Sequence, residues 1–256
     1  MTTVRDILHY VESIAPKELA MDWDNVGLLC GQADREVKKV LVALDPFTSV
    51  CEEAANLGAD LLVTHHPLIF QPLTAITDET TVGKAALTLI QNSIAAINAH
   101  TNLDCADGGV NDTLAETLKL TNIQKAPTDP EGLLRMGEVE RQDLDAFLDR
   151  VEAFLGCNGL RYVSGGRPVK KVAVGGGACG SELYAVIDAG CDTFVTADVK
   201  YNQFCDAKEL GLNLIDAGHF ATENPVVAVL AKKLQTQFPG LEVKISETHR
   251  DCVKYY

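Results

Sequence analysis

Apolar residues recur along the chain with two different periods. Val4–Ile14 and Leu144–Leu155 have the three-to-four-residue spacing that predicts amphipathic helices. Lys39–Leu44 and Leu61–Thr64 are short apolar runs rich in β-branched residues, as expected of strands buried on both faces. The alternation continues with predicted helices over 48–57, 82–92 and 110–118 and predicted strands over 94–98 and 160–163. It predicts an α/β fold with mixed sheets flanked by helices.

Part of this pattern occurs twice. Residues 37–66 and 169–198 align without a gap and share ten identities in thirty, beginning with Val-Lys-Lys-Val in both segments. We therefore expect two similar α/β repeats, residues 1–124 and 125–256, with a linker-like segment near 121–130 that contains Pro127 and Pro130. The C-terminal helix and strand either complete the second repeat or pack back on the first.

Charge and hydropathy narrow the class of protein. The 256 residues carry 22 Lys and Arg against 36 Asp and Glu, a formal net charge of −14, which argues against nucleic acid as a general partner. The sequence contains no run of about 18 apolar residues, so no membrane-spanning helix is expected. The N-terminus has no signal pattern. We expect a soluble, cytoplasmic protein. Its eight cysteines include no C-x-x-C pair, and we expect them to be small buried thiols.

Candidate ligands stand where strands are predicted to end, which is where α/β sheets hold their ligands. One group is a His-His pair directly after the strand over 61–64. In the two other groups a carboxylate stands four residues after a histidine that follows an apolar run. Together the groups comprise His65, His66, His100, Asp104, His219 and Glu223.

Adjacent residues of an extended chain point in roughly opposite directions. His65 and His66 are therefore expected to hold two ions side by side, with Asp104 or Glu223 bridging them and His219 completing the second ion. A mixture of imidazole and carboxylate suits Zn, Fe, Mn or Ni rather than a thiolate-rich zinc site. Two such ions about 3.5–4 Å apart can activate water for hydrolysis.

His100 has three interpretations: a ligand, a residue that orients a ligand, or a general base. A single histidine at a strand end is more often a hydrogen-bonding residue than a ligand. We favour a catalytic role beside the metals without direct ligation.

Three further features carry alternatives. Gly175, Gly177 and Gly180 match G-x-G-x-x-G, and Asp198 ends the next predicted strand, but a tight turn or an anion cradle is favoured over a nicotinamide cofactor. Asp45 is expected to cap the helix that follows it. Trp23, the only tryptophan, is expected at the edge of the core, with a stacking platform for a ring as the alternative.

Four motifs resemble the signatures of the NGG-one-interacting-factor-three-like family, whose bacterial members are commonly labelled GTP cyclohydrolase type-two homologues. The resemblance runs through nearly the whole chain. The motifs are, in order, Trp23–Leu28, Thr64–Pro67, His100–Asp104 and Asp216–Glu223.

The resemblance implies a dinuclear metal site between the two repeats, with His65, His66, Asp104, His219 and Glu223 as ligands. It also implies a toroidal homohexamer whose metal sites face an interior cavity. Many members are similar in carrying a histidine where this chain has Asn202, so any assistance from that residue is absent here or falls to His100.

The leading hypothesis is a metal-dependent hydrolase of a nucleotide-like or other small substrate, with two divalent ions per chain. The alternative is a non-enzymatic metal-binding or regulatory assembly, such as a metal-insertion factor. A nicotinamide-dependent oxidoreductase is a weaker third reading, since it rests on the glycine cluster alone.

Overall fold

A five-stranded sheet forms the core of the first unit of the computed structural model, which describes residues 1–256. The strand order is β1-β4-β3-β2-β11, and all neighbours are parallel except β1 and β4. Three central strands are buried along almost their whole length because helices cover both faces of the sheet. The strands are β1 (Gly27–Cys30), β2 (Lys39–Ala43), β3 (Leu61–Thr64), β4 (Ala95–Asn98) and β11 (Glu242–Ile245).

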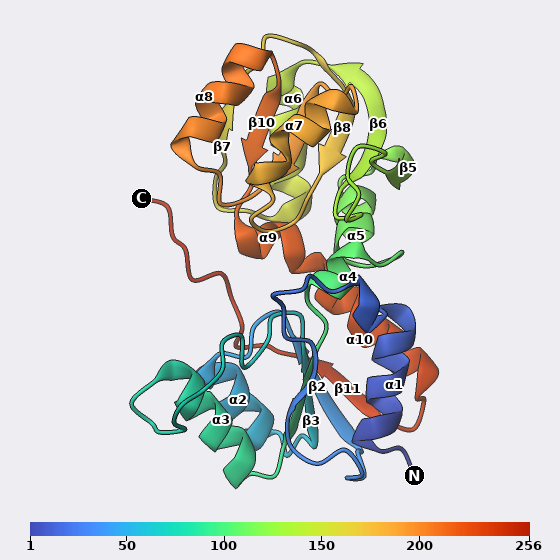
Figure 1. The fold of residues 1–256 in the computed structure, drawn as a ribbon, viewed down its shortest axis with the longest axis vertical. Helices are drawn as coiled ribbons and strands as arrows, with labels where there is room; N and C mark the ends of the chain where they lie inside the picture. Colours follow the sequence, from blue (N-terminus) through green and yellow to red (C-terminus); the bar gives the residue numbers. More distant parts are fainter. The chain divides into compact units, whose positions relative to one another are not determined.

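Two pairs of helices cover this sheet, α2 and α3 on one face and α1 and α10 on the other (Figure 1). Helix α1 buries Val4, Ile7 and Val11, the stripe that its apolar spacing predicts, and Thr3 and Asp6 form a capping box at its start. The helices are α1 (Val4–Ile14), the short 3-10 helix η1 (Lys17–Leu19), α2 (Thr48–Asn56), α3 (Thr81–Gln91), α4 (Thr101–Cys105) and α10 (Pro225–Gln237).

The second unit contains a six-stranded mixed sheet of order β5-β6-β8-β9-β10-β7. Strands β8, β9 and β10 are parallel, and β7 is antiparallel to β10, as β1 is to β4 in the first unit. The two sheets thus share the arrangement of four strands, whereas β11 is parallel to β2 and β6 is antiparallel to β8. The strands are β5 (Thr121–Lys125), β6 (Arg135–Gln142), β7 (Arg161–Val163), β8 (Val169–Val174), β9 (Thr193–Thr196) and β10 (Asn213–Asp216).

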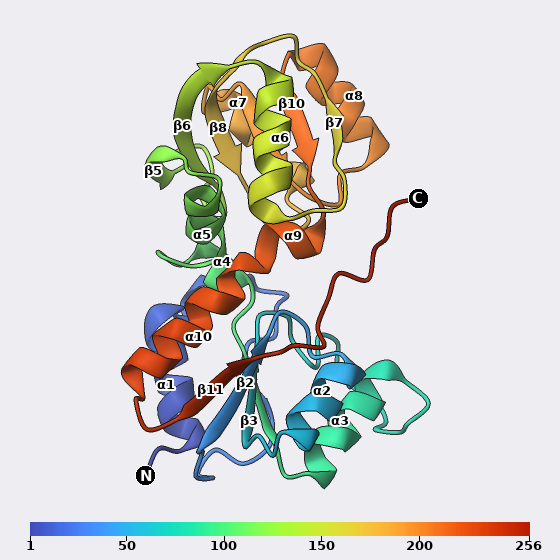
Figure 2. The same ribbon diagram turned by 180° about the vertical axis from the view of Figure 1, so that it is seen from behind.

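Helices cover both faces of the second sheet as well. Helices α5 and α6 contribute to one core cluster, α7 and α8 to another, and Figure 2 shows α6 on the face opposite α7 and α8. The helices are α5 (Val110–Thr117), α6 (Leu144–Leu155), the 3-10 helix η2 (Gly180–Glu182), α7 (Leu183–Asp188), α8 (Tyr201–Leu210) and α9 (His219–Glu223).

The two units have other bounds than the predicted repeats. The first comprises Met1–Ala106 and Val227–Arg250, and the second comprises Asp107–Val226 and Asp251–Tyr256. The two differences are that residues 107–124 belong to the second unit and that Val227–Arg250 belongs to the first. Strand β6 pairs with β8 of the second sheet, and the C-terminal strand β11 pairs with β2 of the first. Strand β11 thus extends the sheet of the first unit, although the second unit precedes it along the chain.

Two local predictions need correction. Residues 121–125 are not linker but the edge strand β5, in which only Ile123 is even partly buried, so no apolar pattern marks it. The short helices α4 and α9 were also not predicted, since five residues are too few for a helical period. None of the helices has the length and apolar character needed to cross a membrane.

Candidate functional site

Three histidines of the first unit converge beyond the ends of β3 and β4. His65 and His66 directly follow β3, and His100 precedes α4. One ring nitrogen of each lies within 4.8 Å of those of the others, and the ring centres are 4.8–5.4 Å apart. On α4, Oδ1 of Asp104 lies 3.6 Å from Nε2 of His65. The first unit therefore brings together four of the six predicted site residues.

The expectation that the rings of His65 and His66 point in opposite directions is wrong. Their centres are 4.8 Å apart and their planes are inclined by 47°. Strand β3 ends at Thr64, whose hydroxyl donates a 2.7 Å hydrogen bond to the backbone oxygen of His66, so the pair lies in a bend rather than in pleated strand. The bend allows both rings to face one ion as well as two adjacent ions.

Each ring of this cluster has its Nδ1 atom against an oxygen acceptor. The acceptors are the backbone oxygen of Ala99 for His65 (2.9 Å), Asp45 Oδ1 for His66 (2.7 Å) and Asp24 Oδ1 for His100 (2.8 Å). A neutral imidazole that donates its Nδ1–H keeps the lone pair on Nε2, which is the arrangement of histidines that bind metals.

Asp45 links two histidines and does not cap α2. Its Oδ1 accepts from His66 and its Oδ2 lies 2.8 Å from Nε2 of His249, while the N-cap position of α2 belongs to Phe47. Burial by itself raises the pKa of the Asp45 carboxyl, but the hydrogen bonds from His249 and His66 outweigh it and hold the pKa well below its usual range. Asp45 is therefore an ionised carboxylate that orients His66.

Asp24 plays the corresponding part for His100. Its side chain is 0% exposed and accepts hydrogen bonds from His100 and from the backbone N–H and hydroxyl of Thr101. Burial opposes ionisation, yet these hydrogen bonds keep the pKa of Asp24 far below its usual range. The sequence identified this residue only as part of a turn.

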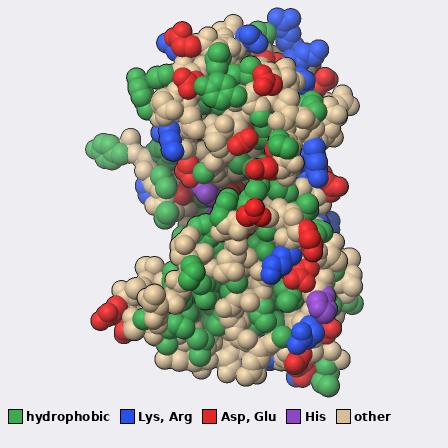
Figure 3. Space-filling view, viewed as in Figure 1, with side chains coloured by type: hydrophobic (Ala, Val, Ile, Leu, Met, Phe, Trp, Pro, Cys, Tyr) green, Lys and Arg blue, Asp and Glu red, His purple; other side chains and the backbone are tan.

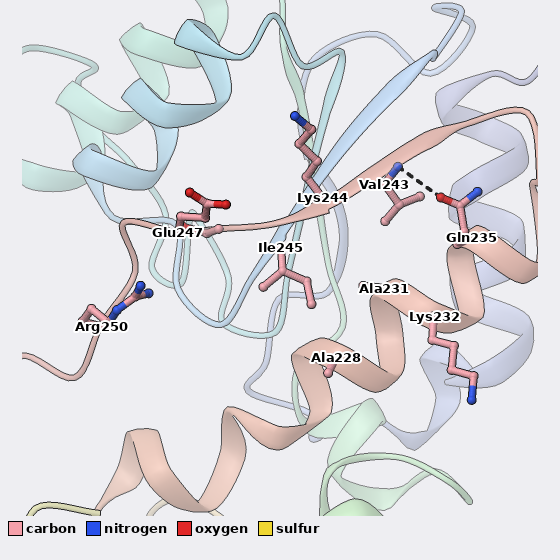
Figure 4. A pocket seen from close by; sticks show the side chains of 10 residues that line it. Ala228, Ala231, Lys232, Gln235, Val243, Lys244, Ile245, Glu247 and Arg250 are labelled. Atoms are coloured by element: carbon pink, nitrogen blue, oxygen red, sulfur yellow. Dashed lines mark hydrogen bonds between the residues drawn. The ribbon is translucent and has the colours of Figure 1, made fainter. Parts of the chain in front are cut away.

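His66 and Asp45 line an open cleft of about 460 Å³, together with Phe47 at the start of α2 and Thr81 at the start of α3. A separate groove of about 630 Å³ lies between α10 and β11 (Figure 4). Its lining includes Lys232, Lys244, Glu247 and Arg250 but none of the candidate ligands. The first of these two hollows is therefore the one that a candidate ligand, His66, lines.

The second unit contributes a smaller cluster on α9. His219 and Glu223 stand one turn apart, with Nε2 of His219 3.0 Å from Oε2 of Glu223. Nδ1 of His219 lies 2.7 Å from Oδ2 of Asp198. Asp198 has a φ of +51°, a left-handed conformation that is uncommon for residues other than glycine. The same orientation of a histidine by a carboxylate thus occurs in both units.

The glycine cluster lies against this helix. A Cβ atom on Gly177 would come within 2.1 Å of Oε1 of Glu223, and φ at Gly177 is +62°. The backbone N–H groups of Gly176 and Gly177 donate to the side chains of Asn111 and Thr222. These donors are therefore used within the protein, and the cluster makes room for Glu223. The hypotheses of an anion cradle and of a nicotinamide site therefore lose these two donors.

The donor chemistry of both clusters fits a divalent ion. Imidazole and carboxylate are the ligands that Zn, Fe, Mn and Ni accept in proteins. His65, Asp104 and Glu223 are buried, with His65 only 1% exposed, whereas His66 and His219 are half-buried. Histidine and carboxylate groups gathered at strand ends thus make metal binding plausible.

The remaining sequence-based candidates lie outside these clusters. Asn202 is exposed on α8. All eight cysteines are free; three are buried, three are half-buried, and Cys205 and Cys252 are exposed, against the expectation for those two. Burial raises the pKa of Cys51 to about 12 and that of Cys191 to about 11, so both are unreactive thiols.

Sequence comparison identifies relatives along the whole chain. Residues 2–252 match the Duf34/NIF3 (NGG1p interacting factor 3) family. A Clostridium perfringens protein named GTP cyclohydrolase 1 type 2 homolog is 36% identical over 262 residues, covering 98% of this chain and 99% of the relative. A Helicobacter pylori protein named GTP cyclohydrolase 1 type 2 is 30% identical over 238 residues, covering 92% of this chain and 93% of the relative.

Solved structures agree with these matches. A Bacillus cereus protein related to NIF3 superposes with a TM-score of 0.93 at 27% identity, covering 100% of this chain and 99% of the other. Reduced HcgD from Methanocaldococcus jannaschii superposes with a TM-score of 0.84 at 32% identity, covering 96% of this chain and 98% of the other. The chain therefore belongs to the Duf34/NIF3 family.

Proposed function

We propose that this protein is a metal-dependent hydrolase acting on a nucleotide-like or other small substrate. The observation that carries the proposal is the shared state of four histidines, each with Nδ1 held by an oxygen acceptor, which makes Nε2 the atom suited to a metal. The relatives named GTP cyclohydrolase 1 type 2 support a nucleotide-like substrate.

In this proposal His65, His66 and Asp104 act with His219 and Glu223 to hold two divalent ions. When bound, such a pair of ions supplies an activated water and stabilises the leaving oxygen. The contribution of the chain is to set the orientation of each ring, through Asp45 on His66 and through Asp198 on His219.

His100 is the proposed general acid and base. Nδ1 of His100 is 2.8 Å from the ionised Asp24, whose negative charge stabilises the imidazolium that forms when Nε2 takes up a proton. Because Asp24 is buried and also bound by Thr101, it holds the ring in one orientation during the transfer.

Metal analysis of protein purified without added metal tests the first step. We expect about two ions per chain, lost in His65→Ala and in Glu223→Ala. His9→Ala and Glu209→Ala are matched controls, since both residues are exposed on helices and neither belongs to a cluster. Wild-type protein that binds no metal would overturn the proposal.

Hydrolysis of GTP, other nucleotides and phosphoesters by the metal-loaded protein tests the second step. We expect His100→Ala to lose turnover by about 10²–10⁴-fold while it retains its metal. A metal-loaded wild type that turns over none of these compounds would instead favour the non-enzymatic metal-binding assembly. We further propose a homohexamer, which a measurement of mass in solution tests.

A further inference from the structure

Two large aromatic side chains stand exposed beside the histidines of the first unit. Trp23 is 61% exposed and Phe70 is 41% exposed, and their rings meet edge to face with centres 5.9 Å apart. Trp23 is therefore not part of the core, contrary to the favoured sequence-based expectation. Figure 3 shows hydrophobic side chains gathered on the surface of this unit over α2 and α3. Leaving large apolar rings in water is unfavourable, so an exposed pair requires an explanation.

The loops that carry these rings are held in place by partly buried hydrogen bonds. Asp24, next to Trp23, is bound by His100 and Thr101. The Asn25 side chain donates a 2.6 Å hydrogen bond to the backbone oxygen of Ile69, next to Phe70. The backbone oxygen of Asn25 in turn accepts from the side chain of Asn98 at the end of β4. The aromatic pair is therefore preorganised, which lowers the entropic cost of binding a ligand.

The pair adjoins the candidate metal cluster through one ring. The centre of the His100 ring lies 6.3 Å from that of Trp23 and 6.1 Å from that of Phe70. The same ring lies 5.2 Å from His65 and 5.4 Å from His66. A ligand resting on the aromatic pair would thus have its reacting end beside the general acid and base of the proposed function.

We propose that Trp23 and Phe70 form a stacking surface for a flat heteroaromatic ring of the substrate, such as a nucleobase. The two rings are inclined by 72°, so one can contact the face of the ligand ring while the other contacts its edge, the two arrangements that aromatic groups prefer. The inference deepens the proposed function and rests on it, because it assigns the part of the substrate that the metal cluster does not bind.

Because Trp23 is the only tryptophan, its fluorescence reports on this surface alone. Three ribose 5-phosphates with different rings (GMP, UMP and nicotinamide mononucleotide) are titrated against the wild type, with ribose 5-phosphate as the ring-free comparison. We expect a saturable change with at least one ring-bearing compound and binding at least tenfold weaker for ribose 5-phosphate, since stacking on one aromatic contributes a comparable factor. No binding of any of the three, or equal binding of ribose 5-phosphate, would overturn the inference.

Variants separate stacking from folding. Phe70→Leu is expected to weaken the ring-bearing compound about tenfold, and Phe154→Leu is the matched control, since Phe154 on α6 is 45% exposed and lies outside the aromatic pair. Calorimetry with Trp23→Phe, which keeps a ring, should show a smaller loss than with Trp23→Leu. Unchanged affinity in Phe70→Leu and Trp23→Leu contradicts the proposal, as does a change in oligomeric mass without a change in affinity.

The metal content of each preparation distinguishes failure of this inference from failure of the proposed function. If the protein lacks metal yet binds the ring-bearing compounds through Trp23 and Phe70, the stacking surface is supported and the hydrolase proposal fails. If the protein holds its metal but shows no preference for ring-bearing compounds, the metal site is supported and the stacking proposal fails.

Discussion

The two candidate clusters, one in each unit, orient their histidines in different ways. In the first unit the acceptors are more shielded from water: the buried backbone oxygen of Ala99, the buried side chain of Asp24 and the half-buried, ionised Asp45. In the second, His219 is 37% exposed and its acceptor Asp198 is 56% exposed, so hydrogen bonding there competes with water. Its geometry depends more on close packing of backbone, with Gly177 directly beneath Glu223. Shielding from water thus orients the histidines of the first unit, whereas contact with the glycine cluster positions Glu223 of the second unit.

The largest effect is expected from a substitution that disrupts the packing of Gly177 against Glu223 in the second unit. Gly177→Ala places a Cβ atom 2.1 Å from Oε1 of Glu223 at a residue with φ of +62°. We expect a loss of about 2–4 kcal/mol in the free energy of unfolding, from left-handed strain plus overpacking, and a matching loss of metal affinity. Denaturant unfolding and metal titration measure the two losses.

Gly156→Ala is the control for backbone strain. Gly156 has the same φ of +62°, but a Cβ atom there would have no other atom within 4 Å. The variant should therefore lose only about 1 kcal/mol. Equal losses in both variants would show that the contact with Glu223 does not matter.

The next effect compares the orienting carboxylates directly. Asp45→Asn removes a half-buried charge between two histidines, and Asp198→Asn removes an exposed one. Loss of such a partner weakens metal binding by about 10–100-fold, and we expect Asp45→Asn near the upper limit and Asp198→Asn near the lower. Metal titration of both variants, with the exposed Asp34→Asn as control, measures the difference. The reverse order would contradict the proposed role of burial.

The smallest effect concerns the support behind Asp45. Glu53 on α2 accepts hydrogen bonds from Ser246 and Thr248 and from the backbone N–H of Glu247, and so holds the segment that carries His249. Burial raises the pKa of Glu53, but these hydrogen bonds outweigh it and lower the pKa below its usual value. Glu53→Gln should cost about 0.5–1 kcal/mol near pH 7, allowing for solvent screening of a partly exposed group.

The pH dependence of that loss has a definite sign. A carboxyl whose pKa is lowered on folding stabilises the protein above its unfolded pKa, about 4.3 for glutamate, and this contribution is lost as the pH falls further. The unfolding curves of the wild type and Glu53→Gln should therefore converge below about pH 4. The neighbouring Glu52→Gln, which removes only an exposed ion pair with Lys84, should show no such convergence. A difference that persists into acid would rule out the charge of Glu53 as its source.

Much of the fold follows from periodicity alone. The apolar spacing of Val4–Ile14 and Leu144–Leu155 predicts both helices to the residue, and the apolar runs predict β2 and β3 to within one residue. Edge strand β5 was not predicted, because most of its side chains face water and need not be apolar. Helices α4 and α9 were not predicted, because segments of five residues are too short to show a helical period.

The candidate ligands also follow from the sequence, since histidines and carboxylates that follow buried parallel strands gather at the carboxyl edge of their own sheet. The sequence did not identify the partners of their Nδ1 atoms. Asp45 and His249 are 204 residues apart along the chain, and no local pattern relates them. From the sequence, Asp24 is expected in a turn and Asp45 at a helix N-cap. In the structure, both instead accept hydrogen bonds from histidines distant in the chain.

The sequence by itself thus determined the class of fold and the chemical types that follow its strands, because these depend on local period and order. The tertiary structure alone decided which sheet β6 and β11 extend and which acceptor orients each histidine. It also placed Trp23 and Phe70 together in solvent. Pairing and burial depend on contacts between residues far apart in the chain, and their free energies leave no periodic trace in the order of the amino acids.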